Sequence, residues 1–264
     1  MFSVIFPGQG SQIVGMASEF YSKFELFKKL YRQADEVLNF PLSKLILEGP
    51  KEKLDLTENT QPAIFLVGYS IFQILKEEYK IDLNKAKFFA GHSLGEYTAL
   101  ACAGALDFES TLKILKFRGN AMQSAVPKGV GGMLAILGSN TETIEKIFSD
   151  NKDKYQCFIA NDNSNGQLVV SGKIENIDKL SLDLASKSIK NIKLPVSAPF
   201  HCHLMSKATE LMKKEIEKLE FGDFQTPLIS NVTATEIQDK VSLKDLLVKQ
   251  IESRVRWRES ILYM

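Results

Sequence analysis

The pentapeptide Gly91-His92-Ser93-Leu94-Gly95 constrains the fold of this chain more than any other stretch. It fits G-x-S-x-G, a sharp turn between a strand and a helix that lifts a serine hydroxyl out of the path of the backbone. Glycines are needed because such a turn leaves no room for a Cβ on either side. The setting agrees, since the apolar Phe88-Phe89-Ala90 precedes the turn and the Ala- and Leu-rich stretch from Leu94 to Leu106 follows it. That setting matters, because so short a pattern arises by chance in roughly one chain in ten of this length.

Strand-like and helix-like stretches alternate along the 264 residues, which predicts an α/β fold. We expect a first strand at Ser3–Phe6, followed by the tight glycine loop Pro7–Gln12. Helices are predicted through about Phe20–Leu38 and Pro62–Tyr79, the second opening with its proline. The expected main domain is α/β-hydrolase-like, with a parallel sheet and the serine turn at the end of one of its strands.

The order of strand-like and helix-like segments changes in the stretch 128–196, which predicts a small inserted subdomain. Its expected elements follow the order β-α-β-β-α-β, the ferredoxin-like arrangement. In chain order they are Met133–Leu137, Thr141–Ser149, Tyr155–Ala160, Gln167–Ser171, Ile177–Ser186 and Ile192–Val196. The main domain is therefore expected to be discontinuous, made of residues 1–127 and 197–264.

Charge and cysteine content exclude several classes of protein. The 33 basic and 32 acidic residues nearly cancel, so the chain lacks the overall charge of a nucleic-acid or anionic-membrane binder. The longest apolar run, Ala63–Leu75, is shorter than the roughly 20 residues that cross a bilayer, and the first residues lack a signal peptide pattern. Cys102, Cys157 and Cys202 have neither disulfide-framework nor zinc spacing, which favours packing roles in a reducing cytoplasm.

Two main-chain amides are candidate donors to an oxyanion beside Ser93. The amide of Leu94 points outward from the start of a helix, and the glycine loop ending at Gln12 is a natural source of a second donor. That loop does not fit a phosphate cradle. A dinucleotide fingerprint from Gly8 and Gly10 would need a third glycine where Ile13 stands, and no G-K-[ST] follows for a P-loop.

A serine nucleophile needs a base, and His92, His201 and His203 are the three histidines of the chain. His92 lies inside the turn, where its side chain is carried away from the hydroxyl. His201 and His203 flank Cys202 and point the same way in an extended stretch, so the pattern does not choose between them. A neutral imidazole can accept the serine proton, and a backbone carbonyl can orient it. Neither histidine has a further ligand at metal-binding spacing, so no metal is expected.

Five motifs in register closely resemble the malonyl-CoA:acyl carrier protein transacylases, the malonyl loading enzymes of bacterial fatty acid synthesis. The motifs are Val4–Gln12, Thr60–Ala63, Gly91–Tyr97, Arg118-Gly119 with Met122-Gln123, and Pro199–Cys202. The resemblance runs from Phe2 to Trp257. It implies transfer of a malonyl group from malonyl-CoA to the phosphopantetheine thiol of acyl carrier protein, by a cytoplasmic monomer without metal or cofactor.

The resemblance also implies a role for each matched residue. Ser93 would be the nucleophile, with His201 rather than His203 as its base. The amides of Gln12 and Leu94 would form the oxyanion hole, and the main-chain carbonyl of Gln250 would orient His201.

Arg118 falls where the family keeps the arginine that pairs with the malonyl carboxylate. A planar guanidinium can hold a carboxylate with two hydrogen bonds, which would discriminate malonyl from acetyl groups. Without the resemblance, an exposed arginine near the end of a helix from Glu109 to Gln123 would be the better interpretation.

Three alternative functions remain open. A serine hydrolase or thioesterase would share the turn at Ser93 and use water as acceptor, whereas a carrier-protein-binding module would be inactive. A third alternative is an acyltransferase of polyketide assembly. Members of the family usually continue past the position of Met264 into a segment with a Gly-Pro-Gly turn, so we expect a truncated chain or a shortened gene product.

Overall fold

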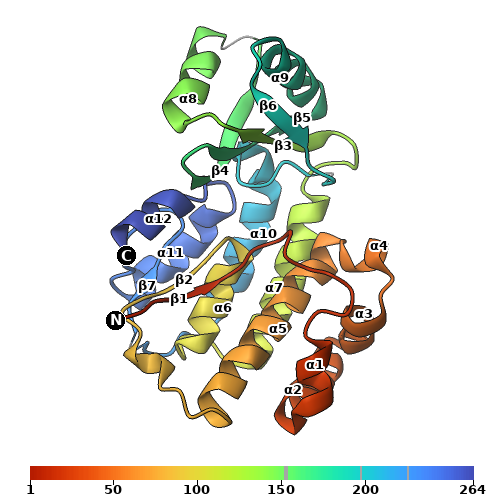
Figure 1. Cartoon of the computed structure of the whole chain (residues 1–264), viewed down its shortest axis with the longest axis vertical. Helices are drawn as coiled ribbons and strands as arrows, with labels where there is room; N and C mark the ends of the chain where they lie inside the picture. Colours follow the sequence, from red (N-terminus) through yellow and green to blue (C-terminus); the bar gives the residue numbers. More distant parts are fainter. Residues whose placement is uncertain (152–153, 197, 225) are drawn as a thin grey trace. The chain divides into compact units, whose positions relative to one another are not determined.

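The computed structural model describes residues 1–151, 154–196, 198–224 and 226–264, and their contacts form two compact units (Figure 1). Unit 1 comprises Met1–Asn120, Glu215–Ser230 and Glu236–Ser242. Unit 2 comprises Ala121–Lys214, Asn231–Thr235 and Leu243–Met264. Residue 197, where we predict a domain boundary, lies outside the described residues. The division into 1–127 with 197–264 and 128–196 stays a prediction.

The elements alternate between helix and strand, as the sequence predicts. In chain order they are β1 (Val4–Phe6), α1 (Ser18–Lys23), α2 (Glu25–Leu38), α3 (Leu42–Glu48), α4 (Lys51–Leu54), α5 (Thr57–Glu77), the 3₁₀ turn η1 (Leu83–Lys85), β2 (Phe89–Gly91), α6 (Leu94–Cys102), α7 (Phe108–Ser124), β3 (Gly131–Leu137), α8 (Thr141–Asp150), β4 (Cys157–Ser164), β5 (Gln167–Lys173), α9 (Ile174–Ser186), β6 (Lys190–Lys193), η2 (His203–Met205), α10 (Ser206–Glu217), β7 (Leu228–Ile229), α11 (Lys240–Gln250) and α12 (Trp257–Tyr263).

Unit 1 contains a short parallel sheet in the order β1-β2-β7 (Figure 1). Strand β2 is buried along its whole length, and its last residue, Gly91, pairs with Phe6 at the end of β1. Helix α6 packs on β1 and β2, and α5 packs on α6. Parallel strands with helical cover are what the alternating pattern predicts, and they bring the ends of β1 and β2 to the same edge.

Helix boundaries near the amino terminus differ from the prediction in two places. Helix α5 begins at Thr57, so Pro62 is its sixth residue and does not open it. The earlier start is stabilised because Asn59 Nδ2 donates to Lys53 O and Thr60 Oγ1 donates to Leu54 O, at 2.8 and 2.6 Å. The predicted helix 20–38 is two helices, because Phe24 has an extended backbone between α1 and α2. Among the described residues, no helix is both long and apolar enough to cross a membrane.

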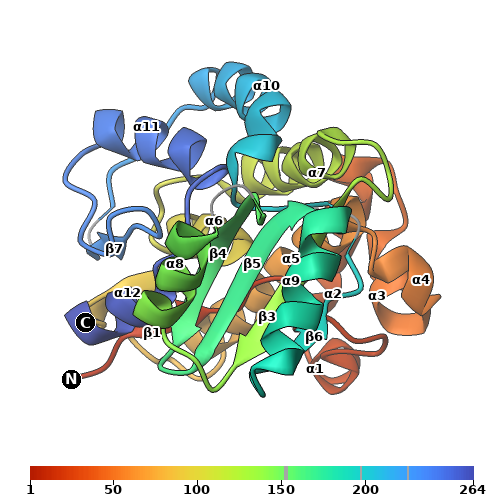
Figure 2. The ribbon, with the colours of Figure 1, turned by 90° about the horizontal axis from the view of Figure 1, so that it is seen from above.

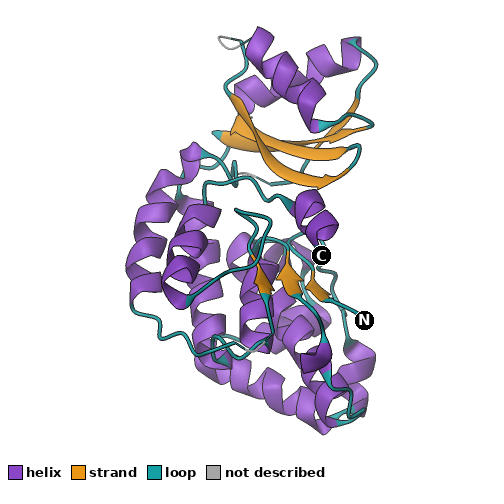
Figure 3. Cartoon of the chain, turned by 90° about the vertical axis from the view of Figure 1, so that its left-hand side faces the viewer, coloured by secondary structure: helices purple, strands orange, loops and turns teal. Residues whose placement is uncertain are grey.

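Unit 2 contains an antiparallel sheet in the order β4-β5-β3-β6. Its elements run β3-α8-β4-β5-α9-β6, the order that the sequence predicts for this stretch. Both helices cover the same face of the sheet, as Figures 2 and 3 show. Leu134 and Ile136 of β3, together with Leu168 and Val170 of β5, project toward those helices at every second residue, as a strand requires.

The cysteines are all buried, and burial raises the pKa of each thiol. The pKa of Cys102 lies well above its ordinary value, that of Cys157 rises to about 12, and that of Cys202 rises to about 11. The thiolate is the nucleophilic form, so these thiols are poorly suited to acyl transfer at neutral pH.

We therefore expect the folded protein to resist thiol alkylation. Iodoacetamide at pH 8 should leave the intact mass unchanged over an hour, because burial hinders access and keeps the thiols protonated. The denatured protein should take up three adducts. Rapid labelling of any cysteine before unfolding would contradict the packing role.

Candidate active site

The Ser93 turn connects a strand directly to a helix, as the G-x-S-x-G pattern predicts, and its backbone is strained. Ser93 has φ 55° and ψ −107°, a conformation that costs a non-glycine residue on the order of 1–3 kcal/mol. Strand β2 ends at Gly91 and helix α6 begins at Leu94, so the serine connects them directly. A Cβ on Gly91 would lie 1.9 Å from the main chain of Gly95, which explains why a glycine is needed.

The glycine loop after β1 lies against this turn. A Cβ on Gly8 would lie 2.8 Å from both His92 Nδ1 and His92 O, and a Cβ on Gly95 would lie 2.6 Å from Phe6 O. The His92 amide also donates to Phe6 O at 3.0 Å. Backbone contact therefore fixes the start of the loop beside Ser93, and His92 contributes to that packing.

The two predicted oxyanion donors, the main-chain amides of Gln12 and Leu94, have no hydrogen-bond acceptor among the described residues. The Leu94 amide is at the first position of α6, where no preceding turn of helix can accept its proton. Both amides belong to unit 1, as Ser93 does. They are available to an external acceptor.

Arg118 lies on α7 with its guanidinium next to the serine hydroxyl. Its Nη2 donates to Ser93 Oγ at 3.1 Å, and its Nη1 donates to Gln61 Oε1 at 2.9 Å. The guanidinium carbon stands 5.6 Å from the centre of the Tyr97 ring. Arg118 is only 1% exposed, so the interpretation as an exposed helix arginine is wrong.

Burial sets the electrostatics around Arg118. It lowers the pKa of the guanidinium, while Tyr97 and the buried Glu96 act in the opposite direction. The pKa of an arginine starts so high that the group stays charged at neutral pH. The same burial raises the pKa of Tyr97 to about 12, so this phenol stays neutral. A positive charge therefore lies within hydrogen-bond reach of Ser93.

The sequence assigned no role to Gln61, Glu96 or Tyr97. Each belongs to a motif quoted above, but no pattern in the chain places them around Arg118. Of these three residues, only Glu96 could have been suspected from the sequence. It lies within an otherwise apolar, Ala-rich helix, and a carboxylate there is costly to bury without a compensating charge.

His201 is buried, 4% exposed, and its imidazole is held by the main chain. Its Nδ1 lies 2.9 Å from the carbonyl oxygen of Gln250, the last residue of α11. A carbonyl can only accept, so Nδ1 carries a proton, and in the neutral imidazole the lone pair is then on Nε2. The carbonyl thus orients the ring and leaves Nε2 able to accept a proton.

The expectation that His201 and His203 point the same way is wrong. His201 has φ 59°, so the stretch is not extended there, and His203 begins the 3₁₀ turn η2. The His203 side chain is exposed and contacts the Phe158 ring edge-on, at 4.4 Å between ring centres.

The predicted site residues fall into the two units. In unit 1, Ser93 and Arg118 are hydrogen bonded, and the free amides of Gln12 and Leu94 belong to the same unit. In unit 2, His201 is hydrogen bonded to the Gln250 carbonyl.

Comparison with known proteins identifies the family. Residues 3–264 match the acyl transferase domain. Over 260 residues the chain is 40% identical to the malonyl CoA-acyl carrier protein transacylase of Bacillus subtilis, covering 97% of this chain and 80% of that protein. The chain belongs to the malonyl-CoA:acyl carrier protein transacylase family.

Solved structures of this transacylase family share the fold. The acyl-carrier-protein S-malonyltransferase of Bartonella henselae superposes with a TM-score of 0.95 at 38% identity, covering 100% of this chain and 84% of that one. A malonyl-transacylase solved with the type II polyketide carrier protein AntF gives a TM-score of 0.94 at 34% identity, with coverage of 99% and 84%. The mixed α/β fold with a parallel sheet is therefore common to this chain and these two structures.

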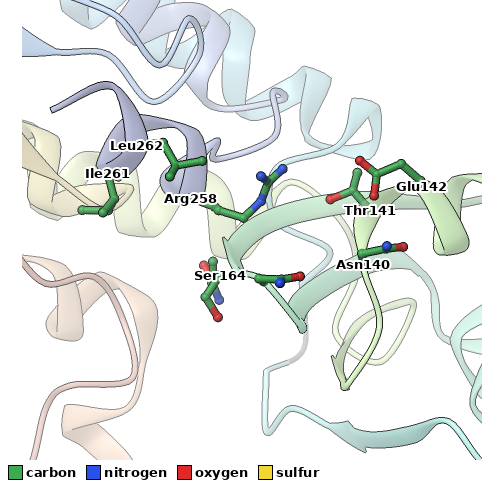
Figure 4. A pocket seen from close by; sticks show the side chains of 9 residues that line it. Asn140, Thr141, Glu142, Ser164, Arg258, Ile261 and Leu262 are labelled. Carbon is green, nitrogen blue, oxygen red and sulfur yellow. The ribbon is translucent and has the colours of Figure 1, made fainter.

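Unit 2 also contains a cavity of about 530 Å³ that includes none of the predicted site residues (Figure 4). In Figure 4, Arg258 of α12 and Glu142 of α8 point toward each other across it. Arg258 also binds Asp162 through two nitrogens, at 3.0 and 2.8 Å. The Arg258 charge is thus paired directly with the Asp162 carboxylate, whereas the guanidinium of Arg118 is hydrogen bonded to an amide oxygen and a serine hydroxyl.

We expect Gly91→Ala to destabilise the fold strongly, because its Cβ would overlap the Gly95 main chain. Overpacking of this kind costs about 3 kcal/mol or more, which corresponds to a loss of roughly 6–12 °C in Tm. The matched control is Gly68→Ala within α5, whose Cβ would meet its nearest atom at 3.5 Å. That control should keep or slightly raise Tm, so equal Tm values for the two variants would contradict the close approach.

Proposed function

We propose that this chain transfers a malonyl group from malonyl-CoA to the phosphopantetheine thiol of acyl carrier protein, through an ester on Ser93. The observation that carries the proposal is the buried Arg118 guanidinium, hydrogen bonded to Ser93 Oγ and Gln61 Oε1. A cation at this position suits a substrate with a carboxylate close to its reacting carbonyl. Malonyl thioesters have such a carboxylate, separated from the carbonyl by one methylene.

In the proposed first half-reaction, Ser93 Oγ attacks the thioester carbonyl and His201 Nε2 takes the hydroxyl proton. The amides of Gln12 and Leu94 donate to the oxyanion of the tetrahedral intermediate. The C–S bond then breaks, and the proton on His201 goes to the departing CoA sulfur. In the second half-reaction the carrier-protein thiol gives its proton to His201 Nε2, and its sulfur attacks the ester carbonyl. The C–O bond to Ser93 then breaks, and the proton on His201 returns to Ser93 Oγ.

The Gln250 carbonyl takes the place of a triad carboxylate in this scheme. It fixes the tautomer of His201, and it stabilises the imidazolium through its dipole. The 2.9 Å hydrogen bond within unit 2 supports the assignment. The proposal requires the His201 imidazole to reach the Ser93 hydroxyl during each half-reaction.

Several finer assignments belong to the same proposal. The protein is a cytoplasmic monomer of fatty acid synthesis, and the reaction uses neither metal nor cofactor. Its main domain, 1–127 with 197–264, is α/β-hydrolase-like, and 128–196 is a ferredoxin-like insert. The antiparallel order β4-β5-β3-β6 supports the second description.

Polyketide assembly is the second candidate pathway, because one similar structure is a malonyl-transacylase with a type II polyketide carrier protein. The chemistry at Ser93 would be the same. Comparing kcat/KM for the two kinds of carrier protein separates these pathways. Free malonate in place of malonylated carrier protein would identify a hydrolase.

We expect Ser93→Ala to abolish the acyl-enzyme. Wild-type protein mixed with malonyl-CoA should gain the mass of one malonyl group, because the ester persists until a thiol removes it. The variant should gain nothing, while the matched control Ser22→Ala, at an exposed serine of α1, should behave as wild type. A malonyl adduct on the Ser93→Ala protein would exclude this serine as the nucleophile.

We expect Arg118→Ala to change selectivity. Malonyl transfer should fall about 100-fold, because a charge-assisted, bidentate contact is lost. Acetyl transfer should change far less, since acetyl-CoA has no carboxylate to bind. The measurement is the ratio of kcat/KM for the two thioesters, with Arg32→Ala at an exposed arginine of α2 as control. Equal losses with both substrates would refute carboxylate binding by Arg118.

A further inference from the structure

The side chain of Gln12 is clamped at both ends. Its Nε2 donates to Asp55 Oδ1 at 2.9 Å, and its Oε1 accepts from the Gly10 amide at 2.8 Å. With its amide group engaged in this way, the side chain does not compete with the Gln12 main-chain N–H for an oxyanion. The hydrogen bonds hold the loop and leave its main-chain amide available.

Asp55 is well suited to anchor this loop. It ends helix α4 and precedes α5, so its backbone is fixed by two helices. Its second carboxylate oxygen, Oδ2, is bound by Lys51 Nζ. Hydrogen bonds from Gln12 and Lys51 lower the pKa of Asp55, so it is an ionised acceptor at neutral pH.

The opposite end of the loop is fixed by the turn that contains the serine. Gly8 lies so close to His92 that no Cβ fits between them. Between these two anchors the loop contains Gly10, which has φ 107° and open space around it. A glycine segment of this kind has high conformational freedom unless other contacts restrain it.

We propose that Asp55 is a positioning residue for acyl transfer, which acts by holding the Gln12 amide where the oxyanion forms. The inference rests on the proposed function, in which that amide is an oxyanion donor. Such donors work because they are oriented before charge develops, so a loop that must be ordered during each turnover loses part of their effect. Asp55 itself touches neither substrate nor Ser93 in this account.

The test compares Asp55→Ala with Asp55→Asn in the full chain. The alanine variant removes the acceptor for Gln12 Nε2, and the rate of malonyl-Ser93 formation at saturating malonyl-CoA should fall about ten-fold. That loss is smaller than the roughly 10²–10³-fold loss on deleting a donor outright, because the amide is still present. The asparagine variant keeps an oxygen acceptor and should recover most of the rate. Lys51→Ala is the control for the loss of the ion pair and should be close to wild type.

Two further readouts separate positioning from general damage to α5, which also contains Gln61. The ratio of malonyl to acetyl transfer should stay within about two-fold of wild type in Asp55→Ala, because both substrates form the same oxyanion. Gln12→Ala, which keeps the main-chain amide, should lose as much rate as Asp55→Ala. The double variant should lose no more than either single one, because both substitutions break the same contact.

The outcomes are distinguishable. Full activity in Asp55→Ala, additive losses in the double variant, or an Asp55→Asn rate as low as that of Asp55→Ala would overturn the proposal. A shifted malonyl-to-acetyl ratio would also overturn it, since the substitution would then act through Arg118. If wild-type protein forms no malonyl ester at all, the proposed function fails first, and the Asp55 proposal fails with it.

Discussion

The hydrogen bond between the buried guanidinium of Arg118 and the hydroxyl of Ser93 is the interaction on which the functional account depends. Removing an arginine from water costs several kcal/mol unless partners compensate for the lost hydration. Gln61 supplies one acceptor, and the buried Glu96 contributes an opposing charge. A charge kept at such expense next to a strained serine makes sense when a substrate carboxylate is to be held beside the reacting carbon.

Unit 1 is built so that several chain segments meet at this serine. The glycines of the turn let α6 approach the end of β1, and the glycine loop after β1 packs on His92. The start of α5 contributes Gln61, and the residues just before it contribute Asp55. Helix α7 packs closely against the start of α5 at Gly119, where a Cβ would lie 2.5 Å from Glu58 Cα. The small residues beside the site thus allow the helices to come close enough for long side chains to reach the nucleophile.

The sequence predicted the parts of this arrangement that depend on local chemistry. The Ser93 turn follows from two glycines at fixed spacing, and the β-α-β-β-α-β order of 131–193 follows from periodicity. The surroundings of Arg118 could not be predicted in this way, because Gln61 and Ser93 are 57 and 25 residues away along the chain. The direction of the His201 side chain could not be predicted either. Nothing in the neighbouring residues indicates its positive φ, which makes it point differently from His203. The sequence predicts the start of α5 too late, because Pro62 resembles a first-turn proline. Side-chain contacts of Asn59 and Thr60 instead stabilise the helical turn that precedes Pro62.

A crystal structure of the protein after reaction with malonyl-CoA would test the central claim most directly. The account predicts an ester on Ser93 Oγ, with both carboxylate oxygens of the malonyl group within hydrogen-bond distance of the Arg118 guanidinium. An acyl group attached elsewhere would contradict it. So would a malonyl ester whose carboxylate points into solvent while Arg118 keeps its bond to Gln61 alone.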